Sequence, residues 1–216
     1  VLYMMVYYPL QRRKSSTVIL LIASIALMVL IENLLLLIFG AGVKSLDILP
    51  VQRGMSILGA IVTPLQIGII VVSISLFVVL FVFVKYSKMG KIMRAVADNP
   101  YLANITGINT KKIQMWTFII GSALAGVAGV LIGLENSLSP HMGTNLVIRG
   151  FAGAVIGGIT SIPGAVLGSY VLGFVANFGI WYLPSSYKEA IAFTVLLIFL
   201  LFRPYGIFGI GKGVRE

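Results

Sequence analysis

The chain has 216 residues, of which 59% are hydrophobic and 10% charged, and its mean hydropathy is +1.05. This composition excludes an ordinary soluble domain and predicts an all-α, polytopic membrane helix bundle. The lack of cysteine and the single histidine, His141, exclude disulfides, thiolate sites and a histidine metal cluster, so we expect no metal or cofactor. The formal net charge of +10 lies in short segments between apolar runs, which argues against nucleic acid as a partner.

The N-terminal part of the chain predicts a helix stub and one membrane span. Residues 1–8 are apolar and aromatic, with no basic segment or cleavage site, so we interpret them as the end of an interrupted helix and not as a signal peptide. Residues 9–14 predict a turn, and residues 18–39 are long enough to cross a bilayer. Residues 40–63 contain scattered polar side chains and are expected to form a loop on the outer surface.

Two apolar runs predict the central spans. Pro64 stands where a helix tolerates proline, in its first turn, and residues 65–84 follow without a charge. Residues 113–134 predict the next crossing, and residues 135–145 a polar loop. Between the two spans, residues 85–112 form the longest polar stretch of the chain.

The C-terminal part predicts a broken helix and a last helix. Residues 146–183 are too long for one span, so we expect two shorter helices, with Pro163 and Gly164 in the tight turn that joins them. Residues 190–202 form the core of the last helix. With the stub, this gives about five full or partial spans. Small residues four apart allow close helix contact, and such glycines occur as Gly129 and Gly133, Gly153 and Gly157, and Gly164 and Gly168.

The positions of lysine and arginine predict the topology. Of the 16 such residues, only Lys44, Arg53, Arg149 and Lys188 belong to one set of alternate loops. Because positive charges near span ends concentrate on the cytoplasmic side, the other set, which includes residues 85–112 and the C-terminus, is expected in the cytoplasm. The alternation holds only if residues 146–183 cross twice.

The cytoplasmic stretch 88–112 is longer than a connection between two spans needs. Met89, Ile92, Met93 and Val96 recur at helical spacing, which predicts an amphipathic extension of the preceding span. A second helix of about seven residues is expected, with Asn99 as its cap, Pro100 at its first position and Gly107 at its left-handed end. On physical grounds such a segment is either a handle for a protein partner or a basic loop resting on anionic lipid.

Three polar residues inside apolar runs are candidates for the translocation path. Glu32 and Asn33 fall within the span 18–39, where a carboxylate is costly unless it is paired, protonated or facing water. Asn177 lies in the second half of the broken region, and interrupted helices often line transport sites. The alternative for Glu32 is a bond to a neighbouring helix near the outer interface, and for Asn177 an interhelical hydrogen bond.

Residues 93–134 closely resemble the central segment of branched-chain amino acid ABC permeases. Three further stretches are similar to that family and occur in its order. Residues 8–10 resemble the end of its third helix, residues 155–168 (VIGGITSIPGAVLG) its glycine-rich hairpin, and residues 202–209 (FRPYGIFG) its C-terminal signature. The hairpin turn and the C-terminal ending look more like the first permease subtype than the second. The resemblance covers nearly the whole chain as a single permease domain, 1–216, without the family's first helices.

The resemblance implies a permease subunit of an importer in the cytoplasmic membrane. It implies two ABC ATPase subunits, a second homologous permease, an extracytoplasmic substrate-binding protein and membrane lipid as partners. The chain is not expected to be an enzyme, since it contains no G-x-x-x-x-G-K-[ST] motif for ATP. By resemblance, residues 88–112 form the loop that couples to the ATPase, and its candidate contact residues are Met93, Arg94, Ala95, Val96, Ala97, Asp98, Asn99, Pro100, Tyr101, Leu102, Ala103 and Gly107.

Other functions compete with this interpretation. Related permeases for urea, short amides or other amino acids share much of the pattern. An ion-coupled secondary transporter would use several ionisable residues within its spans, whereas Glu32 is the only one expected there. A membrane scaffold without transport would not need broken, glycine-rich helices.

Overall fold

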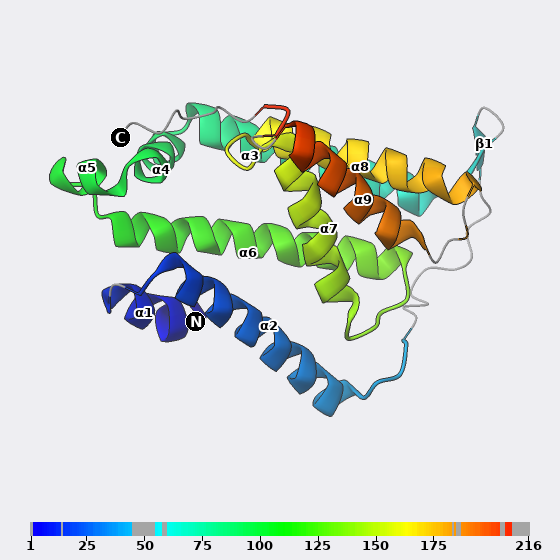
Figure 1. Ribbon diagram of the computed structural model, residues 1–216, viewed down its shortest axis with the longest axis horizontal. Coiled ribbons are helices and arrows are strands. Elements are labelled where there is room, and N and C mark those ends of the chain that lie inside the picture. The colour runs from blue at the N-terminus through cyan, green and yellow to red at the C-terminus, as the bar shows by residue number, and fades with distance from the viewer. Residues whose placement is uncertain are drawn as a thin grey trace. The chain divides into compact units, whose positions relative to one another are not determined.

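The computed structural model describes residues 2–13, 15–44, 55–57, 60–182, 184, 187–203 and 206–208. The chain divides into two compact units, Val1–Pro140 and His141–Glu216, and each is described by itself. The first contains the π-helical segment η1 (Tyr3–Tyr7), α1 (Tyr8–Arg12), α2 (Thr17–Phe39), β1 (Met55–Ile57), β2 (Ala60–Val62), α3 (Pro64–Tyr86), α4 (Lys88–Asp98), α5 (Pro100–Ile105) and α6 (Thr110–Glu135) (Figure 1). The second contains α7 (Met142–Gly157), α8 (Ile162–Tyr182) and α9 (Lys188–Phe202).

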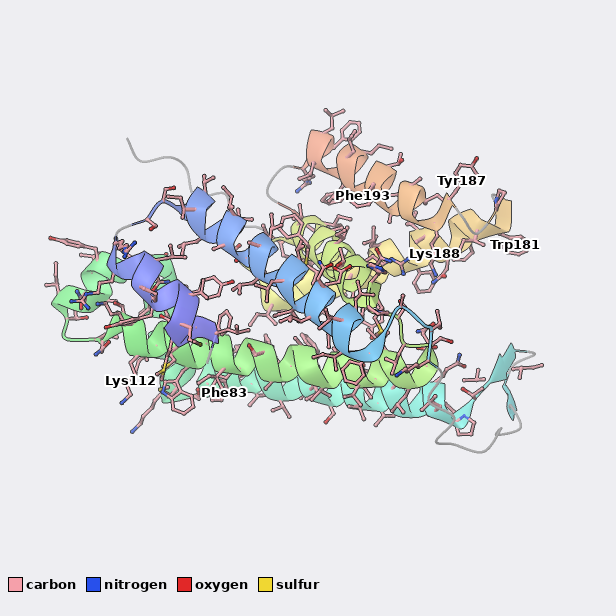
Figure 2. All side chains as sticks on the ribbon, turned by 90° about the horizontal axis from the view of Figure 1, so that it is seen from below. Phe83, Lys112, Trp181, Tyr187, Lys188 and Phe193 are labelled. Carbon is pink, nitrogen blue, oxygen red and sulfur yellow. The ribbon has the colours of Figure 1, made fainter. Side chains whose placement is uncertain are left out.

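Within the described ranges, four helices are long and apolar enough to cross a membrane. They are α2, α3, α6 and α8, while α7 and the apolar part of α9, Ala190–Phe202, are shorter. Aliphatic and aromatic side chains project outward along these helices and remain exposed, as expected for surfaces that face lipid or other subunits (Figure 2). The polytopic helix bundle predicted from composition is therefore confirmed.

The start of the chain is more helical than predicted. The turn expected at residues 9–14 is wrong for its first part, because α1 continues through Arg12. Pro9 lies in the first turn of α1, where its missing N–H costs no hydrogen bond. The hydroxyl groups of Tyr7 and Ser24 are 2.8 Å apart, so a hydrogen bond fastens η1 to α2.

The loop before α3 contains a short antiparallel strand pair. In this pair Met55 lies opposite Val62. The predicted loop otherwise falls largely at 45–54 and 58–59, outside the described residues. Thr63 and Gln66 form a capping box, in which each side chain accepts a hydrogen bond from the other's backbone N–H. This box and Pro64 fix the start of α3.

The sequence analysis predicted α4 as an extension of α3. The structure shows that it is a separate helix. Ser87 separates the two helices, because its backbone is extended and its Oγ caps α4 by accepting a hydrogen bond from the Gly90 N–H at 2.8 Å. Gly90 lies so close to α3 that a Cβ there would overlap the backbone of Phe83 and Val84. The serine cap and the small glycine together allow α4 to turn away while remaining packed on α3.

The second unit is built on a close helical hairpin. Helix α7 begins at Met142, so the polar loop predicted up to residue 145 is too long. Residues 158–161 form the turn to α8, and Gly158 has a φ of 103°. The sequence analysis placed Pro163 and Gly164 in this link, but they lie just after it, in the first helical turn of α8, where a proline costs no hydrogen bond.

Glycines bring α7 and α8 together. A Cβ on Gly157 would overlap the backbone of Gly164, and a Cβ on Gly168 would overlap the backbone of Gly153 and Gly157. Two of the predicted glycine pairs therefore do form a close helix contact. The third pair is different, because within the described part of the chain nothing lies within 4 Å of a Cβ on Gly129, and Gly133 faces the side chain of Leu138.

Beside this contact lies the apolar core of the second unit. Its buried residues come from all three helices, and the chain after α9 returns to cover the end of α7. There the Ile207 N–H donates to the Ile156 carbonyl at 2.9 Å, and the Phe208 N–H donates to the Gly157 carbonyl at 3.1 Å. These two bonds satisfy carbonyls that the end of a helix leaves open. The core consists of Ala152, Ile156, Leu172 and Ala192, with Val195, Leu196 and Phe199 against it.

Candidate functional site

The first candidate surface is the α4–α5 segment, residues 88–107, and local hydrogen bonds shape it. The Asn99 Oδ1 accepts from the backbone N–H groups of Tyr101 and Leu102, at 3.0 and 3.1 Å, and Pro100 follows at the first helical position. Gly107 ends the segment with a φ of 83°. The predicted cap and left-handed end are both confirmed, and α5 has six residues.

The apolar side of α4 packs inside the protein. Val96 is buried in a cluster with Ala103 of α5 and Ile113 of α6. Met89, Ile92, Met93 and Ile108 pack against the same cluster. Since these side chains contact protein, the amphipathic pattern of α4 needs no lipid surface to explain it.

Helix α5 presents apolar side chains outward. Tyr101, Leu102 and Ile105 are 74%, 58% and 66% exposed, whereas Ala103 on the other side is 5% exposed. Exposed aromatic and aliphatic side chains on a short, well-capped helix are typical of a surface that binds a protein partner. Of the predicted contact residues, Val96 and Ala103 are buried and Met93 is half-buried. The exposed ones are Arg94, Ala95, Ala97, Asp98, Asn99, Pro100, Tyr101, Leu102 and Gly107.

Positive charges flank this apolar surface. Lys88, Lys91 and Arg94 are exposed on α4. The Arg94 Nη2 donates to the Lys85 carbonyl at 3.2 Å, which holds the guanidinium against the end of α3. The Lys85 ammonium in turn lies 5.3 Å from the centre of the Phe81 ring, a cation–π distance. The α4–α5 segment therefore combines an apolar tip with a cationic base.

The three residues predicted for the translocation path lie on different parts of the chain. Asn33 donates to the Val29 carbonyl of its own helix at 2.8 Å, and Glu32 beside it is half-buried and makes an interaction of its own. Both belong to α2 in the first unit. Asn177 belongs to α8 in the second unit, where it lines an open groove.

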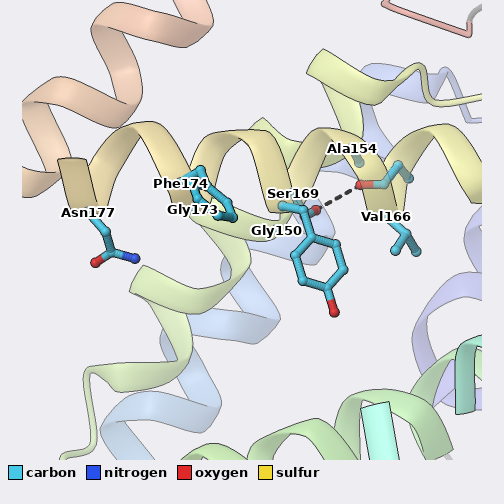
Figure 3. Close-up of a pocket in the computed structure, with 9 residues that line it drawn as sticks. Gly150, Ala154, Val166, Ser169, Gly173, Phe174 and Asn177 are labelled. Atoms are coloured by element: carbon cyan, nitrogen blue, oxygen red, sulfur yellow. Dashed lines mark hydrogen bonds between the residues drawn. The ribbon is translucent and has the colours of Figure 1, made fainter. Parts of the chain in front are cut away.

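This α7–α8 groove has a volume of about 620 Å³. Most of its wall is apolar, and Ser169 and Asn177 supply polar side chains on α8 (Figure 3). The Ser169 hydroxyl donates to the Ala165 carbonyl at 2.9 Å, so it is directed back to its own helix. The lining residues are Gly150, Ala154, Ala165, Val166, Ser169, Tyr170, Gly173, Phe174 and Asn177.

The sequence analysis missed a second cavity, of about 310 Å³, which includes Arg149 and Lys188. It treated both residues only as loop charges that report topology. Because α7 begins at Met142, Arg149 lies inside this short apolar helix and not in a loop, where the topology count placed it. A single arginine in an apolar run was the available signal.

Comparison with known proteins gives a consistent result. A family profile described as "Branched-chain amino acid transport system / permease component" matches residues 2–200. The high-affinity branched-chain amino acid transport system permease protein LivH of Escherichia coli K12 is 39% identical over 151 residues, which are 69% of this chain and 49% of the relative. The Pseudomonas aeruginosa permease BraD is 41% identical over 152 residues, 70% of this chain and 50% of the relative.

A more distant relative extends the comparison to an archaeon. The probable branched-chain amino acid transport permease protein LivH of Methanocaldococcus jannaschii is 34% identical over 154 residues, 66% of this chain and 49% of the relative. The chain thus spans about half the length of these curated relatives. No solved structure matches it significantly. The profile match and these identities show that the chain belongs to the family of branched-chain amino acid transport system permease components.

Proposed function

We propose that the chain is part of the permease subunit of an ABC importer that carries branched-chain amino acids across the cytoplasmic membrane. Family membership and relatives named for branched-chain amino acid transport support the substrate class. The observation that carries the importer mechanism is the α4–α5 segment, with its apolar tip of Tyr101, Leu102 and Ile105. Separate ATPase subunits hydrolyse ATP.

In this proposal α5 docks in a groove of an ATPase subunit. A capped helix keeps its shape when the ATPase moves it. Val96 of α4 and Ala103 of α5 pack with Ile113 of α6, so a movement of α5 is passed to the membrane helix α6. Burial of Tyr101 and Leu102 supplies the affinity, because aromatic anchors dominate most interfaces. The cationic base of the segment adds attraction to an acidic groove rim or to lipid headgroups.

The partners follow from the same mechanism. Two ATPase subunits, a second homologous permease and an extracytoplasmic binding protein complete the importer. Residues 85–112 and the C-terminus face the cytoplasm, in keeping with the distribution of lysine and arginine. ATP binding closes the ATPase pair, and the permeases open outward to receive substrate from the binding protein.

A reconstituted importer tests the proposal. The complete permease, co-expressed with its ATPases, second permease and binding protein, is placed in proteoliposomes, where leucine uptake and ATP hydrolysis are measured. Uptake that requires ATP and the binding protein is expected. A complex whose ATPase rate ignores both binding protein and substrate would refute the proposal.

A double variant, Tyr101→Ala with Leu102→Ala, tests the coupling surface. Loss of an interface anchor costs about 2 kcal/mol or more, so recovery of the ATPase with the purified permease should fall by at least about tenfold. Leu37→Ala is the matched control, because Leu37 is 84% exposed on α2, away from the segment. Equal ATPase recovery with the double variant and the control would show that α5 does not dock.

A further inference from the structure

Residues of α7, α8 and α9 line the second cavity of the C-terminal unit, here called the Arg149 cavity. Its volume is about 310 Å³, at the lower end of the range for small-molecule pockets. Three of its lining residues belong to the well-packed part of the unit, since Leu172, Ala176 and Ala192 are 5%, 5% and 7% exposed. Leu146 adds a half-buried aliphatic group. This part of the cavity therefore suits a short branched hydrocarbon group.

The rest of the lining is cationic and polar. Arg149 comes from α7, Lys188 from the first residue of α9 and Asn177 from α8 (Figure 2 labels Lys188). The described residues that line the cavity include no carboxylate. Arg149 and Lys188 bring cationic donor groups to one small cavity, and such donors favour an oxyanion as ligand.

The donor chemistry is suited to a carboxylate. Arginine offers a planar fork of N–H donors and lysine three ammonium donors, while the Asn177 side chain offers both donors and an acceptor. Arg149 also makes an interaction within the chain, and its five N–H donors allow it to share the guanidinium with a ligand.

We propose that the Arg149 cavity binds an oxyanion carried on a short aliphatic group, and that its ligand is the transported amino acid, held by its carboxylate. This inference rests on the proposed function and adds a substrate-binding site to it. The cavity shares Gly150, Ser169, Gly173 and Asn177 with the α7–α8 groove, so a ligand released from the cations continues along that groove. A lipid phosphate is the other source of the same oxyanion chemistry.

Charge removal in the complete reconstituted importer tests the site. Arg149→Gln, Lys188→Gln and the double variant are compared with the charge-conserving Arg149→Lys and Lys188→Arg. Lys44→Gln is the control, since it removes one exposed cation that the topology places on the same side of the membrane and that lies outside the cavity. The readout is leucine uptake per ATP hydrolysed, together with stimulation of the ATPase by the loaded binding protein.

We expect each glutamine variant to lower uptake per ATP about tenfold, the effect of one charge-assisted hydrogen bond. Stimulation of the ATPase should stay within about twofold of wild type, because the α4–α5 segment is untouched, whereas a merely structural defect would lower both. The charge-conserving variants should recover at least about half of the uptake, since they keep the attraction for the carboxylate.

Four outcomes would overturn this inference. Normal uptake per ATP in the double variant would refute the cavity as a substrate site while leaving the proposed function intact. A parallel loss of ATPase stimulation, without recovery in the charge-conserving variants, would assign Arg149 and Lys188 to folding. A loss of co-purified phospholipid phosphorus at normal uptake would assign the cations to a lipid headgroup. No uptake by the wild-type importer would refute both the site and the proposed function.

Discussion

Replacement of Gly168 by alanine tests the close contact between α7 and α8. A Cβ on Gly168 would overlap the N and Cα atoms of Gly157 and the carbonyl oxygen of Gly153. These are backbone atoms in the C-terminal half of α7, so they cannot rotate away as a long side chain can. The substitution therefore forces α7 and α8 apart and loosens the core around Ile156 and Leu172.

The size of this effect follows from two opposing terms. Overpacking of a tight contact costs about 1–3 kcal/mol, while alanine improves helix propensity over glycine by about 1 kcal/mol. Gly126→Ala on α6 carries the same propensity change without a clash, because among the described residues no atom beyond the neighbouring backbone of α6 lies within 4 Å of a Cβ there. The difference in stability between the two variants isolates the packing cost.

Thermal unfolding of the detergent-purified protein measures that difference. About 1 kcal/mol corresponds to a shift of about 2–4 °C in a chain of this size, so Gly168→Ala should melt about 2–12 °C below Gly126→Ala. Equal melting temperatures would refute the reasoning, since they would mean that Gly168 of α8 does not lie against the backbone of α7.

Three further changes have defined outcomes. Asn99→Ala removes the cap of α5 and should cost about 1 kcal/mol locally, seen as faster amide hydrogen exchange in α5; unchanged exchange would contradict the role of the cap. Gly206→Ala places a side chain at a φ of 81° against Gly158, and should lower the melting temperature through about 1–3 kcal/mol of strain. Thr63→Ala breaks the capping box with Gln66 and should cost about 0.5–2 kcal/mol, whereas an unchanged melting temperature would mean that Pro64 alone fixes the start of α3.

Helices with strong local signals were predictable. The run 65–84 is uncharged and follows a proline, and the helix occupies Pro64–Tyr86. Likewise Asn99, Pro100 and Gly107 each favour one conformation through their own chemistry, so the bounds of α5 follow from three residues. In both cases the decisive interactions lie within a few residues of each other along the chain.

Departures from prediction occur where the decisive contact is distant or ambiguous. Pro9 is compatible with either a turn or a first helical turn, and the structure adopts the second. Ser87 favours a cap but is tolerated inside a helix, so the serine alone did not predict the break; in the structure it caps α4, and Gly90 packs closely on α3. Periodicity predicted the apolar face of α4 but could not say that Ile113, after α5, would cover it.

The role of Arg149 shows why a site is harder to predict than a span. Its charge satisfies the topology count, so the arginine within an apolar run received no second explanation. The cavity exists only because α9 packs beside α7 and α8 and brings Lys188 to the same opening. Membrane topology requires only that a cation lie near the end of a span. The proposed binding of a carboxylate requires two cations and an apolar lining in the same cavity. Arg149→Lys and Arg149→Gln should therefore differ little in membrane orientation, because Lys188 and Lys44 still mark that side, yet Arg149→Lys should keep at least about half of the uptake per ATP and Arg149→Gln about a tenth.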